Sequence, residues 1–133
     1  MDGLLILYVG AGGALGSISR YALTYFIQSR SQSPFPTATL LVNVTGSLLI
    51  GFLMRYAGET SSISVEARVL LTTGFCGGYT TFSTFSYETV RLIEDGDYSR
   101  ATLYALLSLV LTLAAAFAGF ALARATLALR RDL

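Results

Sequence analysis

Several residue types that carry enzyme chemistry are missing from this 133-residue sequence. It contains no His, no Lys and no Trp, so all nine of its basic residues are Arg. The lack of His excludes a catalytic His and a His-ligated metal site. Cys76 is the single cysteine, which excludes an intrachain disulfide and CxxC chemistry. The formal net charge of +1 gives no electrostatic basis for binding nucleic acid.

Charge of either sign is also scarce. Charged residues make up 13% of the chain and hydrophobic residues 53%. A soluble globular domain has about 25% charged residues. Because the deficit extends along the whole chain, it indicates that most of the surface faces lipid.

Apolar segments long enough to cross a bilayer, which takes about 20 mostly apolar residues, recur along the chain. We predict spans at about residues 4–26, 37–54, 69–93 and 101–127, separated by short polar stretches. The sequence therefore predicts an all-α membrane protein, a single domain of four transmembrane helices covering residues 1–133. Four short spans do not easily enclose a pathway, so we expect the chain to oligomerise or to pack against a partner.

The arginines give almost no topological bias. Positive residues near span ends set the orientation of a membrane protein, and the predicted spans divide these residues five to four between the two sides. One interpretation is an antiparallel, dual-topology homodimer, and the other is a fixed topology set by a few of these residues. One side has Arg55, Arg68, Arg124, Arg130 and Arg131, and the other has Arg20, Arg30, Arg91 and Arg100.

The third predicted span mixes glycines, hydroxyl groups and aromatic rings in a way that a lipid-facing helix does not need. Gly77 and Gly78 each destabilise a helix by about 1 kcal/mol relative to Ala, so we predict a helix break near these two residues, in the middle of the membrane. Unwound backbone at that depth requires protein or water around it, and its carbonyls become ion ligands. The alternative is a close helix crossing that needs both glycines.

Two phenylalanines follow the glycine pair. Phe82 and Phe85 lie on nearly the same face of a resumed helix. The edge of a phenyl ring is electropositive, so two rings presented edge-on fit an anion path, although packing against a neighbouring helix is the commoner use of Phe. Glu88 lies further along the span, where an ionisable residue is a functional candidate unless it is close enough to the interface to be solvated.

Two other spans carry polar residues in register. Asn43 in the second span, with Thr39 one turn earlier, needs partners in hydrocarbon, and its amide can donate to an anion while its oxygen accepts from a neighbour. Tyr104, Ser108 and Thr112 form one stripe of hydroxyls on the fourth span, although such hydroxyls often bond back to their own helix. Together these residues predict a polar, anion-compatible track.

Arg20 lies near the end of the first predicted span. It can extend its side chain to the interface, or it can form a positive vestibule that attracts anions. Both interpretations remain open at this point.

The segment GFCGGYTTFSTFS, residues 74–86, resembles the signature of the Fluc/CrcB fluoride channels. The resemblance extends to GGALG (residues 12–16) with Arg20 and Tyr21, to VNVTGSLLIG (residues 42–51), and to the pair Tyr104 and Ser108. It covers essentially the whole chain. It implies a multi-pass protein of the bacterial inner membrane, an antiparallel dual-topology homodimer with two pores that export cytoplasmic fluoride passively and relieve its toxicity.

The resemblance also implies roles for individual residues. A structural Na⁺ at the dimer interface is expected on the backbone carbonyls of Gly77 and Thr80 of each subunit. The expected partners are fluoride, a second copy of the chain and the lipid bilayer. The vestibule, expected at Arg20, follows from the position of that residue and not from the resemblance. The predicted pore residues are Asn43, Phe82, Phe85, Tyr104, Ser108, Thr112, Thr39 and Glu88.

Three other classes compete with a channel. A proton-coupled small multidrug transporter would need a Glu in its first span and Trp, and the sequence has neither. A non-transporting scaffold would have no reason to place Asn43 and a hydroxyl stripe at one depth. An intramembrane enzyme lacks a His, Lys or paired acid to activate its many hydroxyls, so the sequence predicts that the chain is not an enzyme.

Overall fold

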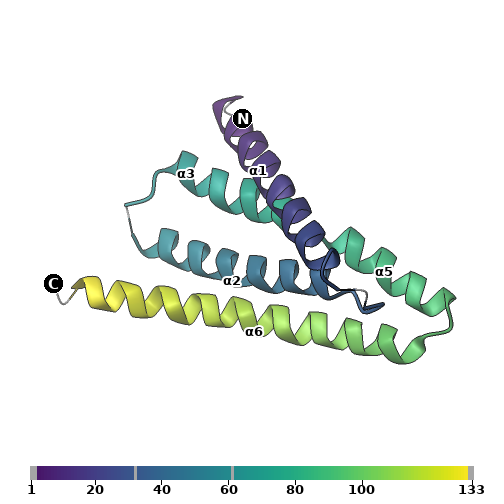
Figure 1. The fold of residues 1–133 in the computed structure, drawn as a ribbon. Helices are drawn as coiled ribbons and strands as arrows, with labels where there is room; N and C mark the ends of the chain where they lie inside the picture. Colours follow the sequence, from purple (N-terminus) through teal and green to yellow (C-terminus); the bar gives the residue numbers. More distant parts are fainter. Residues whose placement is uncertain (1–2, 32, 61, 132–133) are drawn as a thin grey trace.

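The computed structural model describes residues 3–31, 33–60 and 62–131 of the chain. All regular elements in these ranges are helices (Figure 1), which confirms the all-α prediction. In chain order they are α1 (Gly3–Gln28), α2 (Thr37–Glu59), α3 (Val65–Val69), the π-helix η1 (Leu70–Cys76), α4 (Gly77–Tyr79), α5 (Phe82–Glu94) and α6 (Tyr98–Arg131).

Helices α1, α2 and α6 are long and apolar enough to cross a membrane. Their bounds extend a few residues beyond three of the predicted spans at one or both ends. Large apolar side chains such as Leu7, Tyr21 and Phe117 are exposed on α1 and α6, as expected of surfaces that face lipid. The chain is therefore a multi-pass membrane protein. The segment predicted as the third span is divided into α3, η1, α4 and α5, which Figure 1 shows running on from one another behind α1.

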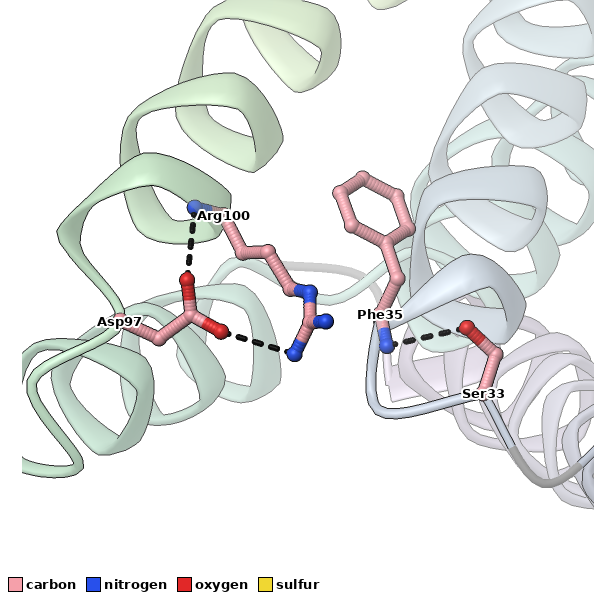
Figure 2. A network of polar contacts seen from close by, with 4 residues as sticks. All are labelled: Ser33, Phe35, Asp97 and Arg100. Atoms are coloured by element: carbon pink, nitrogen blue, oxygen red, sulfur yellow. Dashed lines mark hydrogen bonds and ion pairs between the residues drawn. The ribbon is translucent and has the colours of Figure 1, made fainter.

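Local sequence signals explain where the short helices begin and end. Ser64 precedes α3, and its Oγ accepts a hydrogen bond from the backbone N–H of Ala67. Asp97 precedes α6 and accepts from the backbone N–H and the guanidinium of Arg100 (Figure 2). Between α5 and α6, Gly96 has a φ of +77°, which only glycine adopts without strain.

Glycines lie in the two most extensive helix contacts. Helix α1 packs against η1 through Gly12 and Gly16, where a Cβ would lie 2.2 Å from the carbonyl oxygens of Leu70 and Phe75 respectively. Helices α2 and α6 lie side by side (Figure 1), and a Cβ on Gly119 would lie 2.2 Å from the carbonyl oxygen of Leu48. Small residues of this kind let membrane helices approach closely.

The third predicted span is broken near Gly77–Gly78, as predicted, but the two glycines are themselves helical and are not the break. Gly77 has helical dihedral angles (φ −64°, ψ −38°), and both glycines belong to α4. The chain leaves the helix at Thr80 and Thr81, which are extended. Gly78 agrees with the alternative interpretation, a close helix crossing, because a Cβ there would lie 2.4 Å from the carbonyl oxygen of Gly13 in α1. The glycine serves the helix crossing, and the break needs another cause.

Candidate functional site

Asn43 of α2 stabilises the extended backbone at the break. The backbone N–H of Thr81 donates to Asn43 Oδ1 (2.8 Å), and Asn43 Nδ2 donates to the carbonyl oxygen of Thr81 (3.0 Å). One amide side chain thus satisfies both backbone groups of a residue that no longer has helical partners. The hydroxyl of Thr81 then accepts from the backbone N–H of Thr84 and caps α5. Asn43 keeps a second N–H, which these bonds do not use.

A cavity of about 530 Å³ lies beside the break. It brings together five of the predicted pore residues and both residues predicted to hold Na⁺. The described residues around it are all uncharged. They are Asn43, Ser47, Ile50, Cys76, Gly77, Thr80, Thr81, Phe82, Phe85, Ala105, Ser108, Leu109 and Thr112.

Two hydroxyls of α6 face this cavity in different states. Ser108 is 7% exposed, and its buried Oγ has no hydrogen-bond partner among the described residues. An unpaired buried hydroxyl costs about 1–3 kcal/mol, so Ser108 is poised to bind a ligand in the cavity. The hydroxyl of Thr112 instead donates to the carbonyl oxygen of Ser108 (2.6 Å), one turn back in its own helix. In this arrangement the proton of Thr112 is not available to an anion.

Thr39, Glu88 and Tyr104 form a second cluster next to the cavity. The Thr39 hydroxyl donates to Glu88 Oε1 (2.9 Å), and the Tyr104 hydroxyl donates to Glu88 Oε2 (2.7 Å). Thr39 and Tyr104 are buried and Glu88 is half-buried. The three residues come from α2, α5 and α6, so the carboxylate links the helices at this end of the structure.

A series of aromatic rings joins the cavity to the cluster of Thr39, Glu88 and Tyr104. The ring centroids of Phe82 and Phe85 are 5.4 Å apart, and those of Phe85 and Tyr104 are 5.2 Å apart. Phe82 is 79% exposed, whereas Tyr104 is fully buried. The rings therefore lead from the surface of a single chain, past the cavity, to the carboxylate of Glu88.

The end of α4 offers carbonyl groups that suit a hard cation. The backbone N–H that would bond the Gly77 carbonyl in an uninterrupted helix is that of Thr81, and it donates to Asn43 instead. Gly77 is exposed, with no atom within 4 Å of the place where a Cβ would be. Thr80 is extended (ψ 158°), so its carbonyl also leaves the helical direction. Neutral oxygens of this kind coordinate Na⁺ at broken membrane helices, so Gly77 and Thr80 fit the predicted role.

Arg20 lines neither the cavity nor the Glu88 cluster. Its Nε donates to the carbonyl oxygen of Gly78 (3.2 Å), and the Ser17 hydroxyl approaches the same oxygen (3.4 Å). This carbonyl is among those that the break deprives of a helical donor. The guanidinium therefore ties α1 to α4 and places positive charge beside the break.

Sequence reasoning missed two residues of the site. Ser47 lines the cavity, and its position one turn after Asn43 on α2 was an available signal. Phe35 packs edge-to-face against Tyr104, but it lies in a polar loop between two prolines, where nothing in the sequence marks a contact with a residue far along the chain.

The sequence is similar to known proteins over most of its length. The model of the family described as "CrcB-like protein, Camphor Resistance (CrcB)" matches residues 7–120. A relative from Rhizobium meliloti, named fluoride-specific ion channel FluC, is 49% identical over 120 residues, covering 90% of this chain and 96% of that protein. The protein of the same name from Chlorobaculum tepidum is 50% identical over 119 residues, covering 90% of this chain and 94% of the relative. These are names of ion channels and not of enzymes.

Proposed function

Since the chain belongs to the CrcB family, we propose that it is a fluoride-selective channel that exports cytoplasmic fluoride passively and so relieves fluoride toxicity. The observation that carries this proposal is the uncharged cavity beside the break. There the unpaired hydroxyl of Ser108 lies in the same cavity as Asn43 and the two phenylalanines. The relatives named fluoride-specific ion channels support the choice of ion.

The donors of the cavity suit a small dehydrated anion. The second N–H of Asn43 and the hydroxyl of Ser108 replace water in the first shell, and the edges of the Phe rings add weakly positive groups. Because no fixed charge lines the described cavity wall, the ion binds weakly enough to leave. The ion then passes the aromatic rings toward the cluster of Thr39, Glu88 and Tyr104, whose two hydroxyl protons are donated to the carboxylate in this arrangement.

The proposed channel is an antiparallel dual-topology homodimer in the bacterial inner membrane. Its four crossings are α1, α2, the bent segment from α3 to α5, and α6. One chain leaves Phe82 79% exposed and Gly77 open to its surroundings. Phe82 also forms part of the wall of the polar cavity, so a second copy that covers this ring would close the path. Two copies would give two pores.

We further propose that Na⁺ binds at the dimer interface, on the carbonyls of Gly77 and Thr80 of both copies. When bound, the ion supplies positive charge between the two anion paths. Two carbonyls from one chain are too few for a cation site, which is a further reason to expect the second copy. The side chains do not take part in this site, so the backbone of the break alone would form it.

Removing Na⁺ is expected to loosen the dimer. With Na⁺ replaced by N-methyl-D-glucamine, we expect the midpoint of thermal dimer dissociation to fall by roughly 5–10 °C, as for the loss of a ligand present well above its dissociation constant. Size-exclusion chromatography of heated samples measures the midpoint. Thr80→Ser, which keeps the carbonyl, serves as the control and should retain the same Na⁺ dependence. A midpoint that does not depend on Na⁺ in either protein would remove the ion from the proposal.

Fluoride flux through liposomes tests the function directly. Purified protein in liposomes loaded with fluoride should release the ion when a K⁺ ionophore relieves the voltage, because the donors of the cavity offset the dehydration of fluoride. Liposomes loaded with chloride should keep their contents. A fluoride electrode follows the first efflux and a chloride electrode follows the second. If fluoride leaves no faster than from protein-free liposomes, the chain is not a fluoride channel.

A further inference from the structure

The loop before α2 holds Phe35 in a fixed position. The backbone N–H of Phe35 donates to Ser33 Oγ (3.2 Å), and its carbonyl oxygen accepts from the backbone N–H of Thr37 (2.7 Å) and from Thr37 Oγ1 (3.3 Å). Pro34 and Pro36 flank it, and the ring of each proline fixes its own φ. From this braced backbone the Phe35 side chain extends toward α6 (Figure 2).

The ring of Phe35 packs against Tyr104. Their centroids are 5.6 Å apart and their planes meet at 80°, which is the edge-to-face geometry that aromatic pairs favour. On its other side Tyr104 meets Phe85. The phenol is thus held between two rings, and its hydroxyl is aimed at Glu88 Oε2. A fully buried phenol in such a setting has little freedom to turn.

A separate cavity of about 260 Å³, called the outer cavity here, lies on the side of Phe35 that faces away from Tyr104. The loop that carries Phe35, the end of α1 and the polar face of α5 surround it. Phe35 and Glu88 both line this outer cavity, whereas Tyr104 does not. Phe35 therefore lies between the outer cavity and the buried phenol, and Glu88 is the group that reaches both.

We propose that Phe35 is a positioning residue of the anion path, which acts by holding the hydroxyl of Tyr104 on Glu88 at the mouth of the path. Phe35 donates nothing to the ion itself. Its ring fixes the orientation of Tyr104 and keeps the water of the outer cavity away from the phenol. The role in conduction rests on the proposed channel function, whereas the effect on Tyr104 is a property of the fold.

The position of Tyr104 can be measured without any transport. We expect 3-fluorotyrosine at position 104 to give one narrow ¹⁹F resonance in detergent, because the ring occupies one environment. Phe35→Leu should broaden or split this resonance, since Leu fills similar space without the ring edge and leaves Tyr104 more than one orientation, whereas loss of the ring current alone only shifts a single narrow line. Phe35→Tyr should restore the narrow line. Phe117→Leu, which removes an exposed ring elsewhere on α6, should leave it unchanged. A single narrow resonance in Phe35→Leu, shifted or not, overturns the proposal.

Flux then tests whether this positioning matters for conduction. Phe35→Leu should slow fluoride efflux roughly 2- to 10-fold, the factor expected from the loss of one aromatic pair, while Phe35→Tyr and Phe117→Leu remain near the unmodified chain. In a Tyr104→Phe background, which lacks the hydroxyl, Phe35→Leu should cause no further slowing. Equal slowing in both backgrounds, or normal flux in Phe35→Leu with a broadened or split resonance, would overturn the proposed role. If the unmodified chain carries no fluoride, the channel function fails, and the ¹⁹F spectrum still decides whether Phe35 positions Tyr104.

Discussion

Asn43→Asp is expected to slow fluoride efflux by about two orders of magnitude or more, since it removes hydrogen-bond donors and adds a like charge in a poorly solvated site. The substitution preserves shape almost completely. One carboxylate oxygen can still accept from the backbone N–H of Thr81, but the other faces the Thr81 carbonyl oxygen, to which Asn43 Nδ2 now donates at 3.0 Å. The N–H that remains for an anion disappears as well. The initial rate of efflux from liposomes measures the effect.

Two measurements separate a damaged path from a damaged protein. Chemical cross-linking in the membrane should show Asn43→Asp dimers at the level of the unmodified chain, because each chain keeps the glycine contact between α2 and α6 and the proposed interface is formed by Phe82 and Gly77. Thr45→Val provides the matched control on the same helix, where an exposed hydroxyl bonds to the Leu41 carbonyl and to Tyr79. It should conduct normally. Rapid flux through cross-linkable Asn43→Asp dimers would show that Asn43 is not part of the path.

The sequence predicted that Asn43 matters, but not what it binds. An amide within an apolar run must find a partner, and that much follows from its cost in hydrocarbon. Its partner is the backbone of Thr81, and no periodicity on α2 identifies a backbone group on another helix. The same limit explains the displaced break. The low helix propensity of glycine predicted a break caused by Gly77 and Gly78. Tertiary contacts place the break after them, because Gly78 packs on Gly13 and Asn43 binds the backbone of Thr81.

Long apolar segments were predictable because composition alone defines them. The helices α1, α2 and α6 match three predicted spans within a few residues. The π-helix η1 was not predictable, since its wider turns follow no pattern in LLTTGFC. It faces Gly12 and Gly16, whose missing side chains bring two backbones together. The predicted hydroxyl stripe of α6 also contains residues in different states, which their spacing did not show. Ser108 has no hydrogen-bond partner among the described residues, whereas Thr112 bonds to its own helix.

Gly12→Ala is expected to prevent α1 from packing on η1. The new Cβ would lie 2.2 Å from the carbonyl oxygen of Leu70 and 2.9 Å from the backbone nitrogen of Phe75. Both are backbone atoms and cannot rotate away, so the helices must separate, at a cost of about 1–3 kcal/mol or more. We expect a large loss of monodisperse protein and a lower melting midpoint in detergent. Gly10→Ala, two residues earlier on α1 with nothing within 4 Å of its Cβ, should purify normally.

Gly77→Ala extends this comparison from the single chain to the dimer. Within one chain the added methyl group also meets nothing within 4 Å, so the α1–η1 packing should survive and the protein should remain folded. In the proposed dimer, however, the methyl group would lie beside the carbonyls that face the second copy and Na⁺. We therefore expect Gly77→Ala to fold like Gly10→Ala and yet to fail in cross-linking. Within one chain nothing lies close to this methyl group, so only a second copy could be disturbed by it. A Gly77→Ala protein that dimerises normally would therefore show that the interface lies elsewhere.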